Sequence, residues 1–186
     1  SDVYKRQIQD FDVKALLRPE YMKESDESAA CMAAAEDRGV KVIIITSQTD
    51  IQLSSTKLVI HPADKVYEND ASNNSSLVTE VFHGNNSLLF TGDIEKERIA
   101  DIKYELNDAG YDFLKVPHHG RYEKILPEFF SLVGAQSAVI TSSEKNPEDQ
   151  ETVQALVDAG TMNYMLTRGG EITLESDGRE LNFAQK

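Results

Sequence analysis

Two stretches of the chain decide its fold: Leu88–Asp93 (LLFTGD) and Phe113–Gly120 (FLKVPHHG). Each is an apolar run that ends at a glycine beside side chains able to bind a metal, Asp93 in the first and His118 and His119 in the second. The residues between the runs have helical periodicity, so the two runs form one strand–helix–strand unit whose ends face the same side of a sheet. Carboxylates and imidazoles are common ligands of hydrolytic zinc, manganese and iron. The pattern therefore predicts a metal-dependent hydrolase.

The rest of the chain alternates between strand and helix patterns. The run at 40–46 (VKVIIIT) is β-branched and nearly continuous, which is typical of a strand buried on both faces. The polar stretch at 63–75 is a long loop of the kind that often carries function. Other strands are predicted at 13–17, 58–60, 77–82, 87–91, 138–141, 164–166 and 172–174, with a last pairing through Leu181, and helices at 25–39, 94–110, 125–133 and 147–160. This order predicts an α/β fold with a mixed sheet and helices packed on it.

Composition limits the possible functions. The chain has 186 residues, of which 40% are apolar, and this fits one globular domain with a real core. Its apolar runs fall short of the roughly 20 residues that cross a bilayer, so we expect no membrane segment in this chain. A net charge of -13 argues against an extended nucleic-acid footprint. It leaves room for a small-molecule or phosphoester substrate, because bound divalent cations reverse the local field. No feature decides between a cytoplasmic and an exported soluble location.

Each candidate residue also has a structural interpretation. Asp93 is well placed to cap a helix that starts at Ile94, and that role is compatible with metal binding. His118 and His119 are expected to point to opposite sides, one toward a metal and the other toward substrate, and the sequence does not say which is which. Asn73, Asn74 and Ser76 precede a strand and are candidates to bind substrate, although turn formation explains this stretch equally well.

Four other polar residues are interpreted as structural. His61 lies at a strand end before a proline, and His83 lies in a solvated hairpin turn. Glu95 opens the stretch 95–98 (EKER), which is interpreted as a solvated helix start. Lys115 is read as a strand residue whose ammonium group reaches solvent.

From about Phe11 to Leu181 the chain resembles the metallo-β-lactamase superfamily, in particular the branch that includes the hydrolase domain of ComEC-type DNA-uptake proteins. Three ordered motifs carry the resemblance: NNxSLV from Asn73, LFTGDIE from Leu89 and LKVPHHG from Leu114. The resemblance implies an αβ/βα sandwich, with mixed sheets between helix layers, and one or two divalent metal ions, zinc or manganese. It also implies that Asp93 bridges metal and that His118 and His119 belong to the site.

The chain departs from this family at several positions. The N-terminal metal motif His-x-His-x-Asp-His is missing, and only four histidines occur. Arg121 follows the HHG motif where the family often has serine, and Glu148 or Asp149 stands near the place of family histidines. Residues 2–7 (DVYKRQ) are the translation of GATGTGTATAAGAGACAG, a transposon adapter used for sequencing libraries. We therefore expect residues 1–7 to be non-native and the domain at 8–186 to lack its N-terminal metal motif.

Two further hypotheses stay open beside the hydrolase. With so few ligands we expect weak metal binding and little turnover in this chain, so a degenerate hydrolase fold kept as a binding module is the main alternative. A receiver-type signalling domain with an isolated acidic residue is the weaker one, because adjacent histidines and a hairpin before Asp93 do not suit it.

Overall fold

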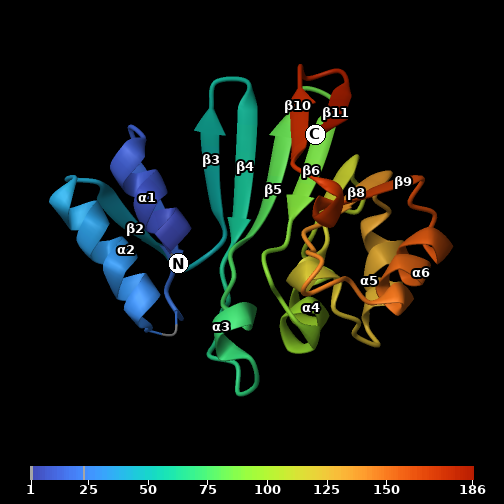
Figure 1. The fold of residues 1–186 in the computed structure, drawn as a ribbon, viewed down its shortest axis with the longest axis horizontal. Helices are drawn as coiled ribbons and strands as arrows, with labels where there is room; N and C mark the ends of the chain where they lie inside the picture. The colour runs from blue at the N-terminus through green and yellow to red at the C-terminus, as the bar shows by residue number, and fades with distance from the viewer. Residues whose placement is uncertain (1, 23) are drawn as a thin grey trace.

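The computed structural model describes residues 2–22 and 24–186 and contains one large mixed sheet (Figure 1). Its seven strands lie in the order in which they occur along the chain. They are β3 (Thr49–Leu53), β4 (Thr56–His61), β5 (Val78–His83), β6 (Asn86–Phe90), β7 (Phe113–Lys115), β8 (Ser137–Ile140) and β9 (Asn163–Leu166). The α/β class predicted from the sequence is confirmed, and β3 is a strand that the sequence pattern did not predict.

The sheet changes from antiparallel to parallel at β6. Strands β3 to β6 pair antiparallel with their neighbours, whereas β6 to β9 run parallel. Parallel neighbours need a crossover, and the crossovers carry α4 (Lys96–Ile102), α5 (Leu126–Val133) and α6 (Gln150–Asp158). The carboxyl ends of β6, β7 and β8 therefore meet at one edge of the sheet, as the strand–helix–strand pattern predicted.

Helices α4, α5 and α6 pack on one face of this sheet and make the main core (Figure 1). One face of α5 is buried, with Phe129 and Phe130 at most 1% exposed. Strand residues Leu89, Leu114 and Ala138 contact this helix layer from the sheet and are fully buried. The core therefore lies directly beneath the strand ends that carry the candidate site.

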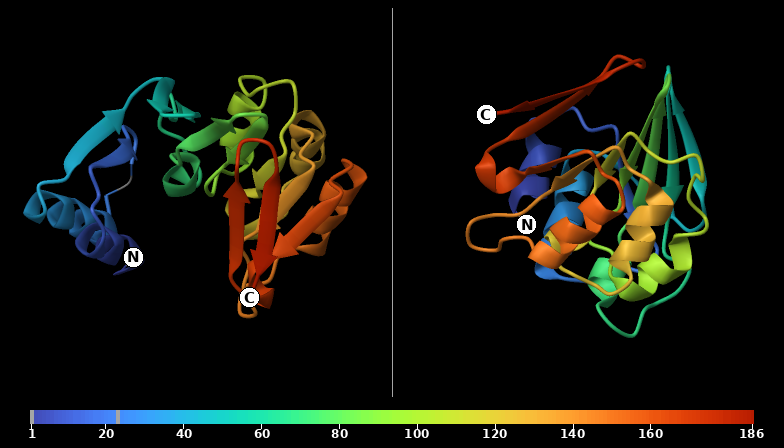
Figure 2. Two further views of the ribbon diagram at one scale, coloured as in Figure 1. Left: turned by 90° about the horizontal axis from the view of Figure 1, so that it is seen from above. Right: turned by 90° about the vertical axis from the view of Figure 1, so that its right-hand side faces the viewer.

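The opposite face of the sheet is covered by a C-terminal hairpin, drawn in red in Figure 2. Strands β10 (Ile172–Ser176) and β11 (Leu181–Gln185) pair antiparallel, which confirms the predicted pairing through Leu181. The hairpin packs on Leu88, Phe113 and Val139. The chain also has the short helix α3 (Ala71–Asn74) within the predicted polar loop, and 3₁₀ turns at Pro117–Gly120 and Thr167–Gly169.

The N-terminal part forms a separate parallel strand pair with two helices on it. It consists of α1 (Asp2–Asp10), β1 (Ala15–Pro19), α2 (Asp26–Asp37) and β2 (Lys41–Ile45), and α1 was not predicted. Ser25 caps α2, and both hydrogen bonds of its capping box are present. The prediction that 40–46 is buried on both faces is wrong, because Val42 is 38% and Ile44 48% exposed.

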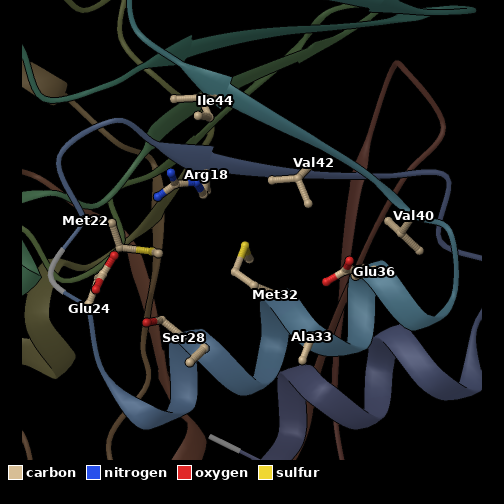
Figure 3. Close-up of a pocket in the computed structure, with 11 residues that line it drawn as sticks. Arg18, Met22, Glu24, Ser28, Met32, Ala33, Glu36, Val40, Val42 and Ile44 are labelled. Carbon is tan, nitrogen blue, oxygen red and sulfur yellow. The ribbon is translucent and has the colours of Figure 1, made fainter.

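The reason for this exposure is an open pocket of about 820 Å³ between α2 and the strand pair (Figure 3). Val42, Ile44 and Met32 line it, so side chains that a packed layer would cover stay partly accessible. β2 pairs only with β1, and two strands with two helices do not fill this space.

None of the helices in the described part of the chain is long and apolar enough to span a bilayer.

Candidate active site

The candidate site is built from the loops that follow β6 and β7. Because these strands are parallel neighbours, the Gly92–Asp93 corner and the Pro117–Gly120 turn meet at the sheet edge. The backbone N–H of His118 donates to the carbonyl of Gly92 over 3.4 Å. The hydroxyl of Thr91 donates to the carbonyl of Lys115 over 2.7 Å. Direct hydrogen bonds therefore join two segments far apart in the sequence, and the prediction that the two strand ends meet is confirmed.

His119 faces Asp93, and its ring is oriented from the other side by Thr141. The distance from His119 Nε2 to Asp93 Oδ2 is 3.3 Å. His119 Nδ1 lies 2.7 Å from the carbonyl oxygen of Thr141 at the end of β8. A carbonyl oxygen only accepts, so Nδ1 carries the hydrogen in this contact and Nε2 is the nitrogen that faces the carboxylate. When the ring carries no second hydrogen, Nε2 is an acceptor like the carboxylate oxygen it faces. Two acceptors at this distance need a proton or a cation between them.

His118 faces a different carboxylate, that of Glu95. The distance from His118 Nδ1 to Glu95 Oε1 is 3.5 Å, and Asn73 Nδ2 donates to the same Glu95 oxygen over 2.6 Å. The Glu95 side chain is 12% exposed and Arg98 is 2% exposed, so the interpretation of 95–98 as a solvated helix start is wrong for these two residues. Burial raises the pKa of Glu95 although the hydrogen bond from Asn73 and the nearby His118 lower it. The sequence does hold a signal for this contact: two carboxylates, Asp93 and Glu95, follow one strand, and two adjacent imidazoles follow the next.

The backbone of the histidine turn is strained. His118 has φ +43° and His119 has φ +55°, in the left-handed region that residues with a Cβ seldom adopt. Gly120 follows at φ +77°, and a Cβ there would lie 2.7 Å from Ile140 Cγ2. Consecutive left-handed residues turn the two rings to separate carboxylates, with ring centroids 6.3 Å apart. Strain of this kind is retained where the surrounding structure fixes a functional geometry.

The predicted substrate-binding residues Asn73, Asn74 and Ser76 lie at the site, and their contacts hold its carboxylates in place. Asn74 Oδ1 accepts from the backbone N–H of Glu95 over 2.8 Å. Ser76 Oγ accepts from the backbone N–H of Asp93 over 3.2 Å. Contact with substrate stays a prediction for all three.

Asp93 does not cap the next helix. Helix α4 begins at Lys96 with Glu95 in the capping position, and Glu95 makes no side-chain cap hydrogen bond. The capping interpretation of Asp93 is therefore wrong, and its carboxylate is left for the site.

Lys115 is the cation that Asp93 contacts in this structure. Its Nζ donates to the carbonyl oxygen of Gly92 over 2.6 Å and to Asp93 Oδ1 over 3.0 Å. The lysine side chain is 17% exposed, so its interpretation as a residue that reaches solvent is wrong. Burial alone would raise the pKa of Asp93, but Lys115 and the two histidines outweigh it and hold that pKa below its ordinary value.

The residues present fit a divalent metal only in part. Two ligands of a tetrahedral metal at about 2.1 Å lie roughly 3.4 Å apart, and the Asp93 and His119 atoms are 3.3 Å apart. A carbonyl that orients the histidine ring is also typical of metal sites. However, no group of three or more His, Cys, Asp or Glu in the described residues is placed to hold an ion. Glu148 is not placed as a further ligand either, since its buried carboxylate pairs with Arg168.

A pocket of about 310 Å³ opens beside the histidine turn. It is lined by His118, His119, Arg121, Thr141, Ser143 and Asn146. The larger pocket of Figure 3 belongs to the N-terminal part and is lined mainly by α2, β1 and β2 rather than by these residues. The chemistry of the chain is therefore expected at the smaller pocket.

Sequence comparison finds a relative of the chain among known proteins. No protein-family model matches it. ComE operon protein 3 of Bacillus subtilis (strain 168) is 29% identical over 135 residues, which is 72% of this chain and 17% of that protein. The chain thus spans a small part of this relative's length, and the predicted resemblance to the ComEC-like branch is confirmed.

Comparison with solved structures places the fold. Igni18, a metallo hydrolase from the hyperthermophilic archaeon Ignicoccus hospitalis KIN4/I, matches with a TM-score of 0.50 at 12% identity, over 93% of this chain and 81% of that chain. YhfI from Bacillus subtilis, a metallo-β-lactamase fold protein, matches with a TM-score of 0.47 at 8% identity, over 87% and 66%. The 12% identity to Igni18 speaks for the fold alone, and this match supports the predicted fold.

Proposed function

We propose that this chain forms part of a metal-dependent hydrolase of the metallo-β-lactamase fold that acts on phosphodiesters. In this proposal Asp93 and His119 supply two ligands for a zinc or manganese ion. A bound divalent ion would lower the pKa of a water molecule toward about 7 and polarise the ester oxygen.

One observation carries the proposal: the placement of the His119 ring between the Thr141 carbonyl and the Asp93 carboxylate. His119 Nδ1 lies 2.7 Å from the carbonyl oxygen of Thr141, and Nε2 lies 3.3 Å from Asp93 Oδ2. If the ring carries its hydrogen on Nδ1 alone, the Nε2 lone pair faces the carboxylate, which is unfavourable without a proton or a metal ion between them. A metal ion satisfies both atoms at once.

The remaining residues of the site have supporting roles. Ser76 and the glycine corner position Asp93 through its backbone N–H. Asn73 and Asn74 hold Glu95, which in turn faces His118 and fixes the direction of its ring. His118 is then the residue that contacts substrate or stabilises developing charge, and His119 is the ligand.

Isothermal titration with zinc and with manganese tests the proposal. We expect weak binding to this chain, since two ligands give little affinity, and no detectable binding after Asp93→Asn or His119→Ala. His83→Ala is the matched control, because His83 lies in the β5–β6 hairpin and contacts Ser176 instead. Metal binding that is unchanged by the Asp93 and His119 substitutions would refute the proposal. Tight stoichiometric metal binding to the wild-type chain would contradict the expected weak affinity.

The alternative function is a non-catalytic binding module. Lys115 favours it, because its ammonium already neutralises Asp93 without a metal. The natural coding sequence upstream of Ile8 separates the two candidates. A reading frame that supplies a His-x-His-x-Asp-His cluster supports the hydrolase, and a natural start near Ile8 supports the module.

A further inference from the structure

The pocket beside the histidine turn differs in charge from the rest of the molecule. The chain has 32 acidic and 19 basic residues. Yet none of the six residues that line this pocket is acidic, and each carries at least one hydrogen-bond donor. A local group of donors in an acidic protein attracts an anion against the field of the whole molecule.

Arg121 provides the permanent positive charge of this pocket. Its Nη1 lies 3.5 Å from Asp149 Oδ1, and both side chains are more than a third exposed. A pair of this length and exposure contributes little, so the guanidinium can turn to another anion at small cost. Asp149 remains anchored without it, because its Oδ2 accepts from the backbone N–H of Tyr122 over 2.8 Å.

Another part of the pocket lining is a tight turn that presents the polar side chains of Ser143 and Asn146. Ser143 and Asn146 exchange backbone hydrogen bonds of 3.1 Å in both directions, and Ser143 Oγ accepts from the Asn146 N–H. The Ser143 hydroxyl hydrogen is therefore free of that bond and can donate to a ligand. Thr141 joins this wall to the site, since it also orients His119.

We propose that this pocket binds the phosphate group of a phosphoester and that Arg121 is the residue that selects for it. A volume of about 310 Å³ is small for a ligand pocket and suits a phosphate group with part of its ester substituent. The planar guanidinium matches two phosphate oxygens at once, which an ammonium group does not. A phosphate held here lies against His118 and His119, next to the atoms that the proposed function uses.

The proposal rests on the proposed function for its substrate, but its test does not need a metal. Inorganic phosphate is titrated into the chain with EDTA present, and binding is followed by NMR shifts of the His118 and His119 ring protons. We expect saturable shifts that weaken as salt rises. Arg121→Ala should weaken binding about tenfold, and Arg121→Lys should restore part of it because the charge remains.

Two further variants show whether the pocket or a general positive charge is responsible. Asn146→Ala removes a donor without changing charge and should weaken binding about threefold. Arg179→Ala, on the exposed β10–β11 turn, should leave binding unchanged. Phosphate binding that is equal in wild type and Arg121→Ala, or that is lost equally in Arg179→Ala, would overturn the proposal. If phosphate binds as expected but zinc and manganese do not bind, only the proposed function is overturned.

Discussion

His119 and Lys115 contact the two oxygens of the same Asp93 carboxylate, so a variant of Lys115 tests what the site needs. The ring contacts Thr141 after β8 and Asp93 after β6, while Lys115 holds the other oxygen of Asp93. A metal at Asp93 must share that carboxylate with an ammonium 3.0 Å away. Repulsion between the two cations then lowers metal affinity, so Lys115 itself helps to explain why this chain should bind metal weakly.

We predict that Lys115→Met binds zinc about tenfold more tightly than wild type, a gain of about 1.4 kcal/mol, as measured by calorimetric titration. In EDTA the same variant should lose about 1 kcal/mol of unfolding free energy, because Asp93 loses its counter-ion. Lys103→Met is the control, since Lys103 pairs with Glu128 away from the site. Unchanged zinc affinity in Lys115→Met would show that the lysine does not compete with metal.

Gly92 is the other residue on which the site geometry depends. It has φ +61°, and a Cβ there would lie 2.6 Å from Ser76 Cβ. We predict that Gly92→Ala costs about 3 kcal/mol in urea unfolding, from strain and collision together. Gly160 has φ +91°, and no atom lies within 4 Å of a Cβ added there. Gly160→Ala should therefore cost only about 1 kcal/mol. Equal losses in the two variants would mean that the contact with Ser76 is not tight.

At the scale of elements, local pattern predicted most of the parallel half of the sheet. The apolar runs before Asp93 and His118 gave β6 and β7 in the correct relation, because parallel strand ends must meet at one edge. The short strand β3 was missed, since Thr49–Leu53 contains only two apolar residues, Ile51 and Leu53. Burial of Val42 and Ile44 was predicted wrongly because periodicity does not reveal whether a second layer is present.

The site was predictable to the extent that its residues lie at strand ends. Asp93, His118 and His119 follow directly from that rule. Glu95 and Lys115 were not identified, because Glu95 directly precedes a helix and Lys115 is the last residue of a strand, and charged side chains at both places are ordinarily solvated. Only their tertiary contacts show that both belong to the site.

The C-terminal hairpin is the element whose removal should loosen the sheet without touching the site. Phe183 on β11 lies 6.1 Å from Phe113 on β7, ring centroid to ring centroid. We predict that Phe183→Ala lowers the unfolding free energy by about 2 kcal/mol and speeds proteolysis of the hairpin. Asn182→Ala, on the exposed side of the same strand, should change neither. Unaltered stability in Phe183→Ala would mean that the hairpin does not cover this core.

At the scale of the whole molecule, acidification has two opposing effects. A net charge of -13 means that carboxylates repel one another, and partial protonation relieves that repulsion. Within the fold, however, the buried Glu80 bonds to His61 over 2.8 Å and accepts from Tyr111 and the Asn107 N–H. Burial raises the pKa of Glu80, but these hydrogen bonds outweigh it and hold the pKa below its ordinary value of 4.5.

A carboxylate with a lowered pKa stabilises the fold above its ordinary pKa, and this contribution disappears as pH falls through the folded value. We therefore predict that Glu80→Gln costs about 2 kcal/mol at pH 7 and that its difference from wild type narrows below about pH 4. Urea unfolding at a series of pH values measures this. Glu171→Gln, an exposed carboxylate, should follow wild type throughout. A difference that stays constant from pH 7 to pH 3 would show that the network contributes by packing alone, and acid sensitivity would then have to come from the surface carboxylates.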